Sequence, residues 1–527
     1  MMVIGCTPEP ESEPEEEEKV DNTIYSVSIS LGYGNDTPKV GSELRATVEN
    51  IRGYSVSGVS YQWKRGDTQY STFVNISNAT SNRYTPTVED SVKYIKVEAR
   101  NSDTTYPVES SIVGPVDANQ VAKPTADIVS GNVVSGQEIT LTSTTEYATI
   151  YYTLDGATPT TSSTQYLSYP KPTITSNCTL KAMATKYGMV NSEILSVSYT
   201  VVTAPSFSSV TSSASIFNYG IYSVTYGNNR FVAGGNGHIA YSSNGTTWTA
   251  STGNSNFLVR GITYGTQFVA VGQYYSGGII NYSSDGTSWN NVTNTTFGTD
   301  STINDVAYGG GRYVAVGGSD VLADVQEGKI AYSTNGTSWT AVTNSTFGTS
   351  TIYGITYGAG KFVAVGAGGK MAYSTNGTSW TAVTDSKFST DTIYGITYGG
   401  PSGKEKFIAV GNSGFSSHQI AYSTDGVTWT RVSQYFSGRL FTGLNRVTWG
   451  GNKYVAVAGA GVMYFSTDGT YWAKIDGGTG ADKSQFDNIG YLSSINDIVY
   501  GGGKFLAVGI KNDDILGPGS GEMAISN

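Results

Sequence analysis

Charged side chains, histidine and cysteine are all scarce in this chain of 527 residues. Asp, Glu, Lys and Arg make up 14% of it, against about 25% in an ordinary globular protein. Only two histidines, His238 and His418, and two cysteines, Cys6 and Cys178, are present. We therefore expect no metal site, no cofactor and no acid–base catalysis by histidine. The two cysteines lie in very different contexts, which argues against a structural disulfide.

Clustered basic residues and long apolar runs are also missing. Without a stripe of Lys and Arg, the chain offers no surface for nucleic acid. No run of 18 apolar residues exists, so no transmembrane helix is expected. The formal net charge is −10, but residues 1–21 alone carry −7. The remaining residues are therefore nearly neutral.

Glycine (66 residues), tyrosine (38 residues), serine, threonine and asparagine supply much of the chain. This mixture disfavours helices and favours short strands joined by tight turns. The length suggests three or four domains of about 100–200 residues each. We predict an all-β protein with two small β-sandwich domains followed by a β-propeller.

The N-terminal segment, residues 1–21, combines a short motif with an acidic stretch. Val3-Ile4-Gly5-Cys6 resembles the end of a bacterial lipobox, which implies that Cys6 carries a diacylglycerol. The following residues are rich in Pro and Glu and predict a disordered, extended tether. A lipobox normally follows a basic and an apolar segment, and only Met1 and Met2 precede this one. The competing interpretation is an acidic tail with an incidental cysteine.

Residues 22–121 show the alternation of half-buried strands, as in YSVSIS, ELRATVEN and KYIKVEAR. Trp63 in the segment YQWKRG, followed by NRYTPTVEDSVKYIKVEA, resembles bacterial immunoglobulin-like modules. That resemblance implies a β-sandwich in which Trp63 fills the core.

Residues 122–202 resemble the accessory domain at the C-terminus of chitobiases and hexosaminidases. The run TIYYTLDGATPTTSSTQY and the later NCTLKAMATKYGMVNSEILSVSYTV carry the resemblance. It implies a small β-sandwich without catalytic residues, serving as a spacer; carbohydrate contact is the alternative. Cys178 falls at a strand position that favours a small residue, and we expect a buried, inert thiol.

A repeat fills residues 203–527. One clear copy reads IYGITYGAGKFVAVGAGGKMAYSTNGTSWTAVT (352–384) and predicts four strands, A to D, with an Asn-Gly or Asp-Gly turn between C and D. An aromatic residue recurs near strand D at intervals that suit propeller blades: Phe207, Trp248, Trp289, Trp339, Trp380, Trp429 and Trp472.

Strand B recurs seven times, but the last copy stops before strand D. The segment PSFSSVTSS (205–213) aligns with TSWTAVTNS, so this N-terminal strand would complete the last blade and close the ring. We predict seven blades, with six as the alternative.

The hairpins, such as STNGTSW and STDGVTW, resemble the Asp-box repeat of bacterial neuraminidases. In this chain no residue separates the Asn or Asp from the Gly, which departs from that pattern. The resemblance implies a structural role in which polar side chains cap the turn and the Trp packs between blades. Calcium at the Asp-Gly turns is the alternative.

Loop length varies mainly on the face formed by the B–C and D–A loops, where recognition is usually built. Aromatic side chains suit sugar rings, and Tyr and Arg suit protein partners. The candidate ligand-binding residues are Tyr274, Tyr275, Phe415, His418, Tyr435, Phe436, Arg439 and Phe441.

The sequence does not predict an enzyme. A sialidase would need a central arginine cluster, and the arginines of the repeats show none; Arg230 and Arg312 in the A–B turns resemble surface charges. No pair of carboxylates for glycoside hydrolysis can be named either.

We predict a bacterial surface or secreted protein that binds an extracellular glycan or a surface protein. Its contact with a membrane would be through the lipid anchor alone. The alternatives are a sialidase-like glycosidase with a site in the central channel, and a structural component of a surface layer, filament or phage tail.

Overall fold

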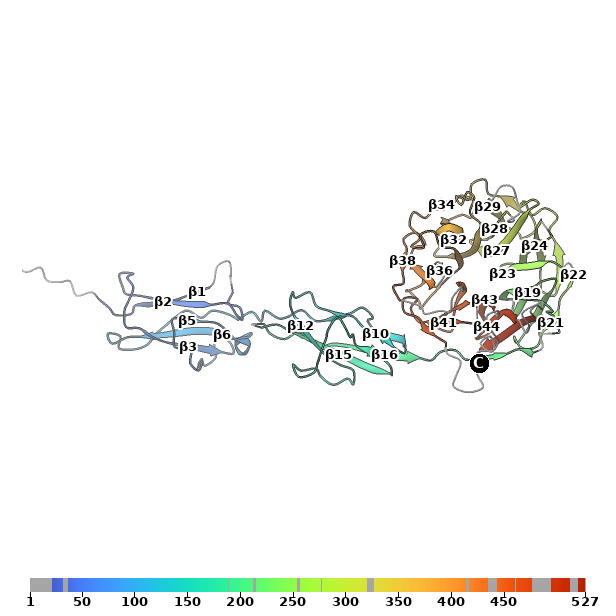
Figure 1. The fold of residues 1–527 in the computed structure, drawn as a ribbon. Coiled ribbons are helices and arrows are strands. Elements are labelled where there is room, and N and C mark those ends of the chain that lie inside the picture. Colours follow the sequence, from blue (N-terminus) through green and yellow to red (C-terminus); the bar gives the residue numbers. More distant parts are fainter. Residues whose placement is uncertain are drawn as a thin grey trace, which may run out of the picture. The chain divides into compact units, whose positions relative to one another are not determined.

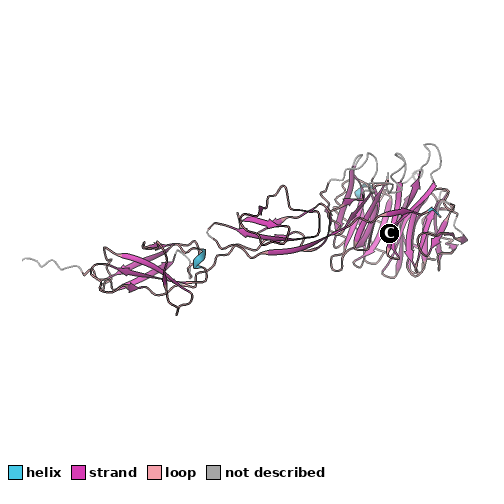
Figure 2. Ribbon diagram, turned by 90° about the horizontal axis from the view of Figure 1, so that it is seen from below, coloured by secondary structure: helices cyan, strands magenta, loops and turns pink. Residues whose placement is uncertain are grey.

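A computed structural model of the chain describes residues 21–31, 37–187, 189–211, 215–253, 256–275, 277–319, 327–413, 417–434, 443–459, 461–475, 494–511 and 520–526. The chain divides into two compact units: residues 1–130, 138–172 and 178–198, and residues 131–137, 173–177 and 199–527. Strands dominate both units (Figure 2), so the prediction of an all-β protein is confirmed. Among the described residues, no helix has the length and apolarity to pass through a membrane.

The described part of residues 21–121 contributes two sheets that share one core. One sheet holds β1 (Ser26–Leu31), β2 (Leu44–Glu49) and β5 (Arg83–Tyr84); the other holds β4 (Val74–Asn75), β3 (Ser60–Gly66), β6 (Tyr94–Arg100) and β7 (Val108–Glu109). Trp63 is fully buried in this core, and its Nε1 donates to the carbonyl of Ser81 at 2.8 Å.

The next part is built on a five-stranded sheet. Its order is β13 (Thr164–Gln165), β12 (Thr149–Thr153), β15 (Cys178–Thr185), β16 (Leu195–Val202) and β9 (Gly131–Val134). Beside it lie two short pairs, β11 (Leu141–Thr142) with β8 (Thr125–Ala126) and β10 (Gln137–Glu138) with β14 (Thr173–Ile174). After β12, the Asp155 side chain accepts from Ala157 N at 2.9 Å and stabilises the turn at Gly156.

Seven further sheets follow in the described part of residues 203–527, and in six of them four consecutive strands of the chain lie side by side in chain order. The first is β18 (Ile221–Gly227), β19 (Arg230–Gly235), β20 (Ile239–Ser242) and β21 (Thr249–Ala250), and the second is β23 (Leu258–Tyr264), β24 (Phe268–Tyr274), β25 (Gly277–Ser283) and β26 (Ser288–Asn291), with β22 (Thr252–Gly253) added beside β26. The third is β27 (Ser301–Gly309), β28 (Arg312–Ser319), β29 (Gly328–Ser333) and β30 (Thr340–Ala341), and the fourth is β31 (Ile352–Gly358), β32 (Lys361–Gly366), β33 (Met371–Ser374) and β34 (Thr381–Ala382). The fifth is β35 (Ile393–Gly399), β36 (Lys406–Ser413), β37 (Ser417–Ser423) and β38 (Thr430–Arg431), and the sixth is β39 (Leu444–Gly450), β40 (Lys453–Ala458), β41 (Met463–Ser466) and β42 (Ala473–Lys474).

The seventh sheet joins the two ends of the repeat region. Its order is β17 (Phe207–Ser209), β45 (Ser520–Ser526), β44 (Lys504–Lys511) and β43 (Ser494–Gly501). β17 pairs antiparallel with β45, and Phe207 stands opposite Ser526.

The sheets surround a common axis (Figure 1), and the strand that corresponds to strand A of the repeat lies innermost in each sheet. These inner strands are β18, β23, β27, β31, β35, β39 and β43; consecutive ones are neighbours, and β43 neighbours β18. The architecture is a β-propeller, as predicted.

A glycine at the end of each inner strand, or directly after it, permits this close approach. A Cβ added at Gly358 would lie 2.0 Å from Cγ of Tyr398 in the next sheet, and one added at Gly501 would lie 2.1 Å from Cγ of Tyr226. The repeated Tyr-Gly pair therefore seats an aromatic ring of one sheet on the glycine of its neighbour.

Candidate functional site

Every inner strand of the propeller contains a β-bulge near its start. The strand pairing skips one residue in each, between positions such as Ile221 and Ser223 or Ile352 and Gly354. A bulged residue is not paired in the ladder, and its side chain is turned away from the regular alternation of the strand. The skipped residues are Tyr222, Arg260, Asn304, Tyr353, Tyr394, Asn445 and Asn496.

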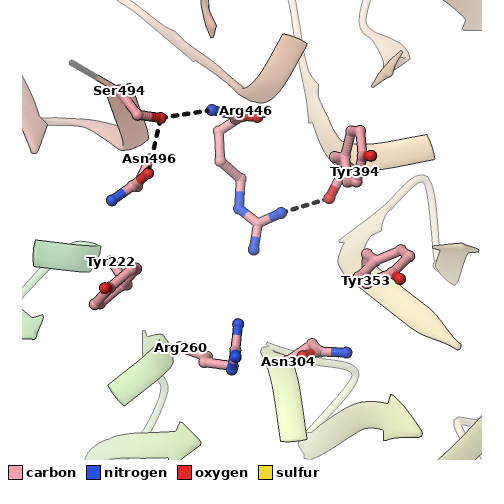
Figure 3. Close-up of a pocket in the computed structure, with 9 residues that line it drawn as sticks. Tyr222, Arg260, Asn304, Tyr353, Tyr394, Arg446, Ser494 and Asn496 are labelled. Carbon is pink, nitrogen blue, oxygen red and sulfur yellow. Dashed lines mark hydrogen bonds between the residues drawn. The ribbon is translucent and has the colours of Figure 1, made fainter. Parts of the chain in front are cut away.

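These seven residues meet at the propeller axis. Together with Arg446 and Ser494 they line one cavity of about 240 Å³ (Figure 3). Inner strands begin where the D–A loops end, so the cavity lies toward the face of the D–A and B–C loops. None of the described residues that line it is acidic or aliphatic. The repeat thus places one side chain from each sheet in a single polar pocket.

Two arginines extend toward the middle of this pocket from opposite sides (Figure 3). Arg446 donates from Nη1 to the carbonyl oxygen of Tyr394. Its Nη2 lies 4.0 Å from Asp305 Oδ2 and its Nε lies 3.9 Å from Asp497 Oδ1. Both distances exceed that of a hydrogen bond, so the two carboxylates balance the charge of Arg446 without clamping it.

The two carboxylates behind Arg446 are bound to the backbone. Asp305 accepts from the N–H groups of Val306 (2.9 Å) and Ile355 (3.1 Å), and Asp497 accepts from Ile498 (2.8 Å) and Val224 (2.9 Å). Each aspartate therefore joins its own sheet to the next one. Burial raises the pKa of Asp305, and it raises the pKa of Asp497 to about 6.

Three asparagines that line the pocket are held in place by hydrogen bonds to the neighbouring strand. Asn304, Asn445 and Asn496 donate from Nδ2 to carbonyl oxygens of the following inner strand, at 2.9, 2.8 and 2.8 Å. Tyr222, Tyr353 and Tyr394 provide the aromatic part of the lining, on two flanks of the arginines (Figure 3). The rings of Tyr353 and Tyr394 have centroids 5.5 Å apart. The pocket therefore offers aromatic faces beside hydrogen-bond donors.

The predicted ligand-binding residues lie elsewhere on the propeller. Tyr274 and Tyr275, at the β24–β25 turn, are exposed, and their rings pack edge to face with centroids 4.4 Å apart. His418 lies on β37, at a position where only the backbone is described. Outside the described residues lie Phe415, Tyr435, Phe436, Arg439 and Phe441, as does Cys6. The assignment of these residues to a ligand remains a prediction.

The polar side chains of the C–D hairpins cap their turns. In STNGTSW, Gly336 N donates to Ser333 Oγ at 2.8 Å, while Asn335 Oδ1 accepts from Thr337 N and Ser338 N at 3.0 and 2.9 Å. Trp339 Nε1 donates to the carbonyl of Gly336 at 3.1 Å. The six hairpin tryptophans are buried, and Phe207 is half-buried. No group of three or more candidate metal ligands gathers in the part of the chain that the structure describes.

The structure gives the surroundings of the arginines and of Cys178. Arg312 lies over the Tyr332 ring and donates to the Asn376 carbonyl of the next sheet, and Arg230 lies over the Tyr241 ring; both arginines stay partly exposed. Two arginines, Arg260 and Arg446, line the axial cavity, which is fewer than the trio that a sialidase would need. The interpretation of Cys178 as a buried residue was wrong: it is half-buried, and burial raises the pKa of its thiol.

The pocket itself was missed, although the repeat contains a signal for it. The segments IYGITYG, VRGITYG, INDVAYG and LNRVTWG share an aliphatic residue at the first and fourth positions, an aromatic residue at the sixth and glycine at the seventh. The second position instead holds Tyr, Arg or Asn. A position that varies inside an otherwise uniform repeat is one whose side chain the fold does not require. A search for known sequence motifs does not find the pocket, because the residues that line it are far apart in the sequence.

Comparison with known proteins identifies one part of the chain. Residues 128–196 match the family described as Chitobiase/beta-hexosaminidase C-terminal domain. This agrees with the resemblance of residues 122–202. No curated protein matches the chain.

Solved structures that resemble the chain include several propellers. YCF48 bound to D1 peptide is 15% identical with a TM-score of 0.43, covering 62% of this chain and 95% of that one. YCF48 from Cyanidioschyzon merolae is 14% identical (TM-score 0.42, 61% and 98%), and an ancestral GH74 enzyme is 16% identical (0.41, 60% and 48%). Scores this low assign neither a function nor a ligand. The chain is thus a β-propeller protein that carries a module similar to the chitobiase C-terminal domain.

Proposed function

We propose that this chain is a non-catalytic binding protein of the cell surface or exterior, and that its propeller recognises a glycan or protein ligand on the face of the D–A and B–C loops. The observation that carries the proposal is the convergence of seven bulged residues in one pocket on that face. Pockets with a few convergent polar groups on a rigid scaffold are typical ligand sites. The variable loops around the pocket would extend the contact.

The proposal includes a seven-bladed ring closed by its N-terminal strand. It is supported by the β17–β45 pairing and by the contacts between the last and first inner strands, at Asp497–Val224 and Asn496–Ile221. The segments 22–121 and 122–202 would act as spacers between a tether, residues 1–21, and the propeller.

The proposed absence of catalysis is supported by the hydrogen bonds of the two carboxylates near the channel. Asp305 and Asp497 accept backbone N–H groups from two sheets each, and Arg446 lies close to both. These bonds account for the two groups as parts of the scaffold, whereas a glycosidase needs carboxyl groups that face the scissile bond.

The test is binding of the full chain to an array of glycans and to intact cells. Tyr353→Ala should reduce retention at least tenfold, because it removes an aromatic wall of the pocket. The matched control is Lys404→Ala with Glu405→Ala in the β35–β36 turn, at the opposite end of the inner strands, which should leave retention unchanged. If the control variant no longer bound glycans or cells while Tyr353→Ala still did, the ligand would bind the face of the A–B and C–D turns, and the proposed site would be wrong. Release of reducing sugar from a retained glycan would contradict the non-catalytic role.

The anchor is tested separately by partitioning the full-length precursor in detergent. Lipidation of Cys6 would place the protein in the detergent phase and would move Cys6→Ser to the aqueous phase. Aqueous partitioning of both forms would remove the lipid anchor from the proposal.

A further inference from the structure

The charged groups at the propeller axis balance one another. Arg446 on β39 lies 4.0 Å from Asp305 on β27 and 3.9 Å from Asp497 on β43. Asp305 also lies beside β23, the strand that carries Arg260, because a Cβ added at Gly261 would stand 3.1 Å from its Oδ1. Two guanidinium groups and two ionised carboxylates have no formal net charge together. A charged ligand would therefore lose its hydration at this axis without finding an excess of opposite charge.

Four residues of the pocket follow one another around the ring in the order asparagine, tyrosine, tyrosine, asparagine. They come from four consecutive inner strands, and they are Asn304 on β27, Tyr353 on β31, Tyr394 on β35 and Asn445 on β39. The centroids of the two tyrosine rings are 5.5 Å apart, and Figure 3 shows both rings on the same side of the pocket. This wall therefore has two aromatic rings at its centre and a side-chain amide at each end.

The two amides of this wall keep their oxygen atoms for a ligand. Asn304 Nδ2 donates to the carbonyl of Ile352 at 2.9 Å. Asn445 Nδ2 donates in the same way to the carbonyl of Ile495 at 2.8 Å. Within the described part of the chain, neither amide oxygen accepts a hydrogen bond, although both side chains line the cavity. An amide oxygen binds a hydrogen-bond donor, which a hydroxyl group supplies and a carboxylate or sulfate does not.

The size and lining of the pocket narrow the ligand further. The cavity measures about 240 Å³, less than the roughly 300–1,000 Å³ of pockets for drug-sized molecules, so it suits a single ring. No aliphatic side chain is present among the described lining residues to receive an apolar peptide side chain. Aromatic faces pack on C–H surfaces, and amides and hydroxyl groups bind the polar rim of the same molecule. A pyranose ring offers both kinds of surface.

We infer that the axial pocket binds one neutral pyranose unit of a glycan, with its C–H face against the Tyr353–Tyr394 pair and its hydroxyl groups donating to the amide oxygens of the flanking asparagines. This inference rests on the proposed function and names the ligand class for the same site. The remaining units of the glycan would lie across the D–A and B–C loops. Because ring contacts and neutral hydrogen bonds carry the binding, its affinity should depend little on salt.

The experiment is calorimetric titration of the full-length protein with the methyl glycosides of glucose, galactose, mannose and N-acetylglucosamine. Glucuronate, galacturonate and glucosamine serve as charged counterparts with the same ring. At least one neutral glycoside should bind about tenfold more tightly than each charged sugar, and its affinity should stay unchanged as salt is raised. Neutral glycosides that bind no better than the charged sugars, or that do not bind at all, would overturn the inference.

Variants of the wall test the two kinds of contact. Tyr394→Leu removes a ring face and Asn304→Leu removes an amide oxygen, so each should weaken binding of the neutral glycoside about tenfold. Tyr394→Phe keeps the ring and should retain most of the affinity. Asn290→Leu is the matched control, because Asn290 lies exposed on the outer strand β26. Thermal melting shows whether each variant is folded. Tyr394→Leu keeps the backbone carbonyl to which Arg446 donates, so it decides the test if Asn304→Leu does not fold.

The outcomes separate this inference from the proposed function. A charged sugar or a peptide that the parent binds and Tyr353→Ala does not would overturn the neutral sugar and leave the binding role intact. A neutral glycoside that binds Tyr394→Leu as tightly as the parent would place the sugar outside the axial pocket and would also overturn the inference. Absence of any retained ligand on the array and on cells would overturn the proposed function itself.

Discussion

At the scale of single residues, polar side chains on the inner strands hold adjacent sheets together through hydrogen bonds to the backbone. Ser223 Oγ accepts from Ile262 N at 3.1 Å, and Asp305 and Asp497 make the equivalent bonds to the following sheets. The position occupied by Ser223, Asp305 and Asp497 is glycine in three other sheets, where it packs directly on the neighbouring strand. Asp497 spans the boundary between the last sheet and the first.

The ionisation of Asp497 makes the free energy of unfolding depend on pH. Burial raises its pKa from the usual 3.8 to about 6, with Arg446 lowering it and Asp305 raising it to smaller extents. A carboxyl with a raised pKa in the folded state stabilises the fold most when protonated, below pH 4, and that contribution is lost as pH rises through about 6. The pKa difference corresponds to about 3 kcal/mol at most.

We therefore expect Asp497→Asn to lose part of the pH dependence of Tm between pH 4 and pH 7. The amide cannot ionise, although its single acceptor oxygen can serve only one of the two backbone N–H groups, so the absolute Tm should be lower. The measurement is thermal melting of both proteins at several pH values, and the slope is the quantity compared. Parallel curves would mean that Asp497 does not titrate in this range.

A second prediction at this scale concerns the hairpin caps. Ser333→Ala removes the acceptor for Gly336 N and should lower the free energy of unfolding by about 1 kcal/mol. Thr337→Ala is the control within the same turn, because its backbone N–H, which donates to Asn335, is retained. Denaturant unfolding of both variants measures the difference.

At the scale of elements, the β-bulge determines which residue of each inner strand lines the axial pocket. Sequence periodicity predicted the strands and their four-strand repeat, because alternation and Asn-Gly turns are local signals. It could not predict the bulges, since a one-residue shift in register depends on how two strands pair. The meeting of the bulged residues at the axis therefore needed the structure, although the varying second position of the repeat marks the residues that meet there.

The inner strands also require glycine at their ends. Gly358→Ala would place a methyl group 2.0 Å from the Tyr398 ring, and the neighbouring strand would have to move. We expect a loss of about 1–3 kcal/mol in unfolding free energy, as for overpacking in a core. Gly277→Ala is the control, since its added Cβ would have no contact nearer than 3.9 Å. Equal unfolding midpoints for the two variants would contradict this packing argument.

At the scale of the whole molecule, the N-terminal strand joins the last sheet of the propeller. Three ladder positions connect β17 to β45, from Phe207–Ser526 to Ser209–Ala524. The aligned segment PSFSSVTSS predicted this strand from the sequence, because the repeat had one strand too few at its end. The boundaries of the two sandwich segments have no comparable signal and stay predictions.

Deleting residues 203–213 should expose the edge of β45. We expect a lower Tm and aggregation on heating, with a larger effect than from deleting residues 22–121, whose own core is separate. Scanning calorimetry with light scattering measures both. A closure deletion as stable as the parent would mean that the ring does not depend on β17.

The seven bulged residues also bear on how such a chain changes over generations. Each lies outside the regular ladder, so its side chain can be exchanged while the backbone pairing of its strand is kept. Tyrosine, arginine and asparagine already occupy equivalent sites in this one ring. A single codon per repeat therefore alters the chemistry at the axis. Related chains with the same blades would diverge in ligand by substitution at these codons, with no insertion, deletion or rearrangement of the scaffold.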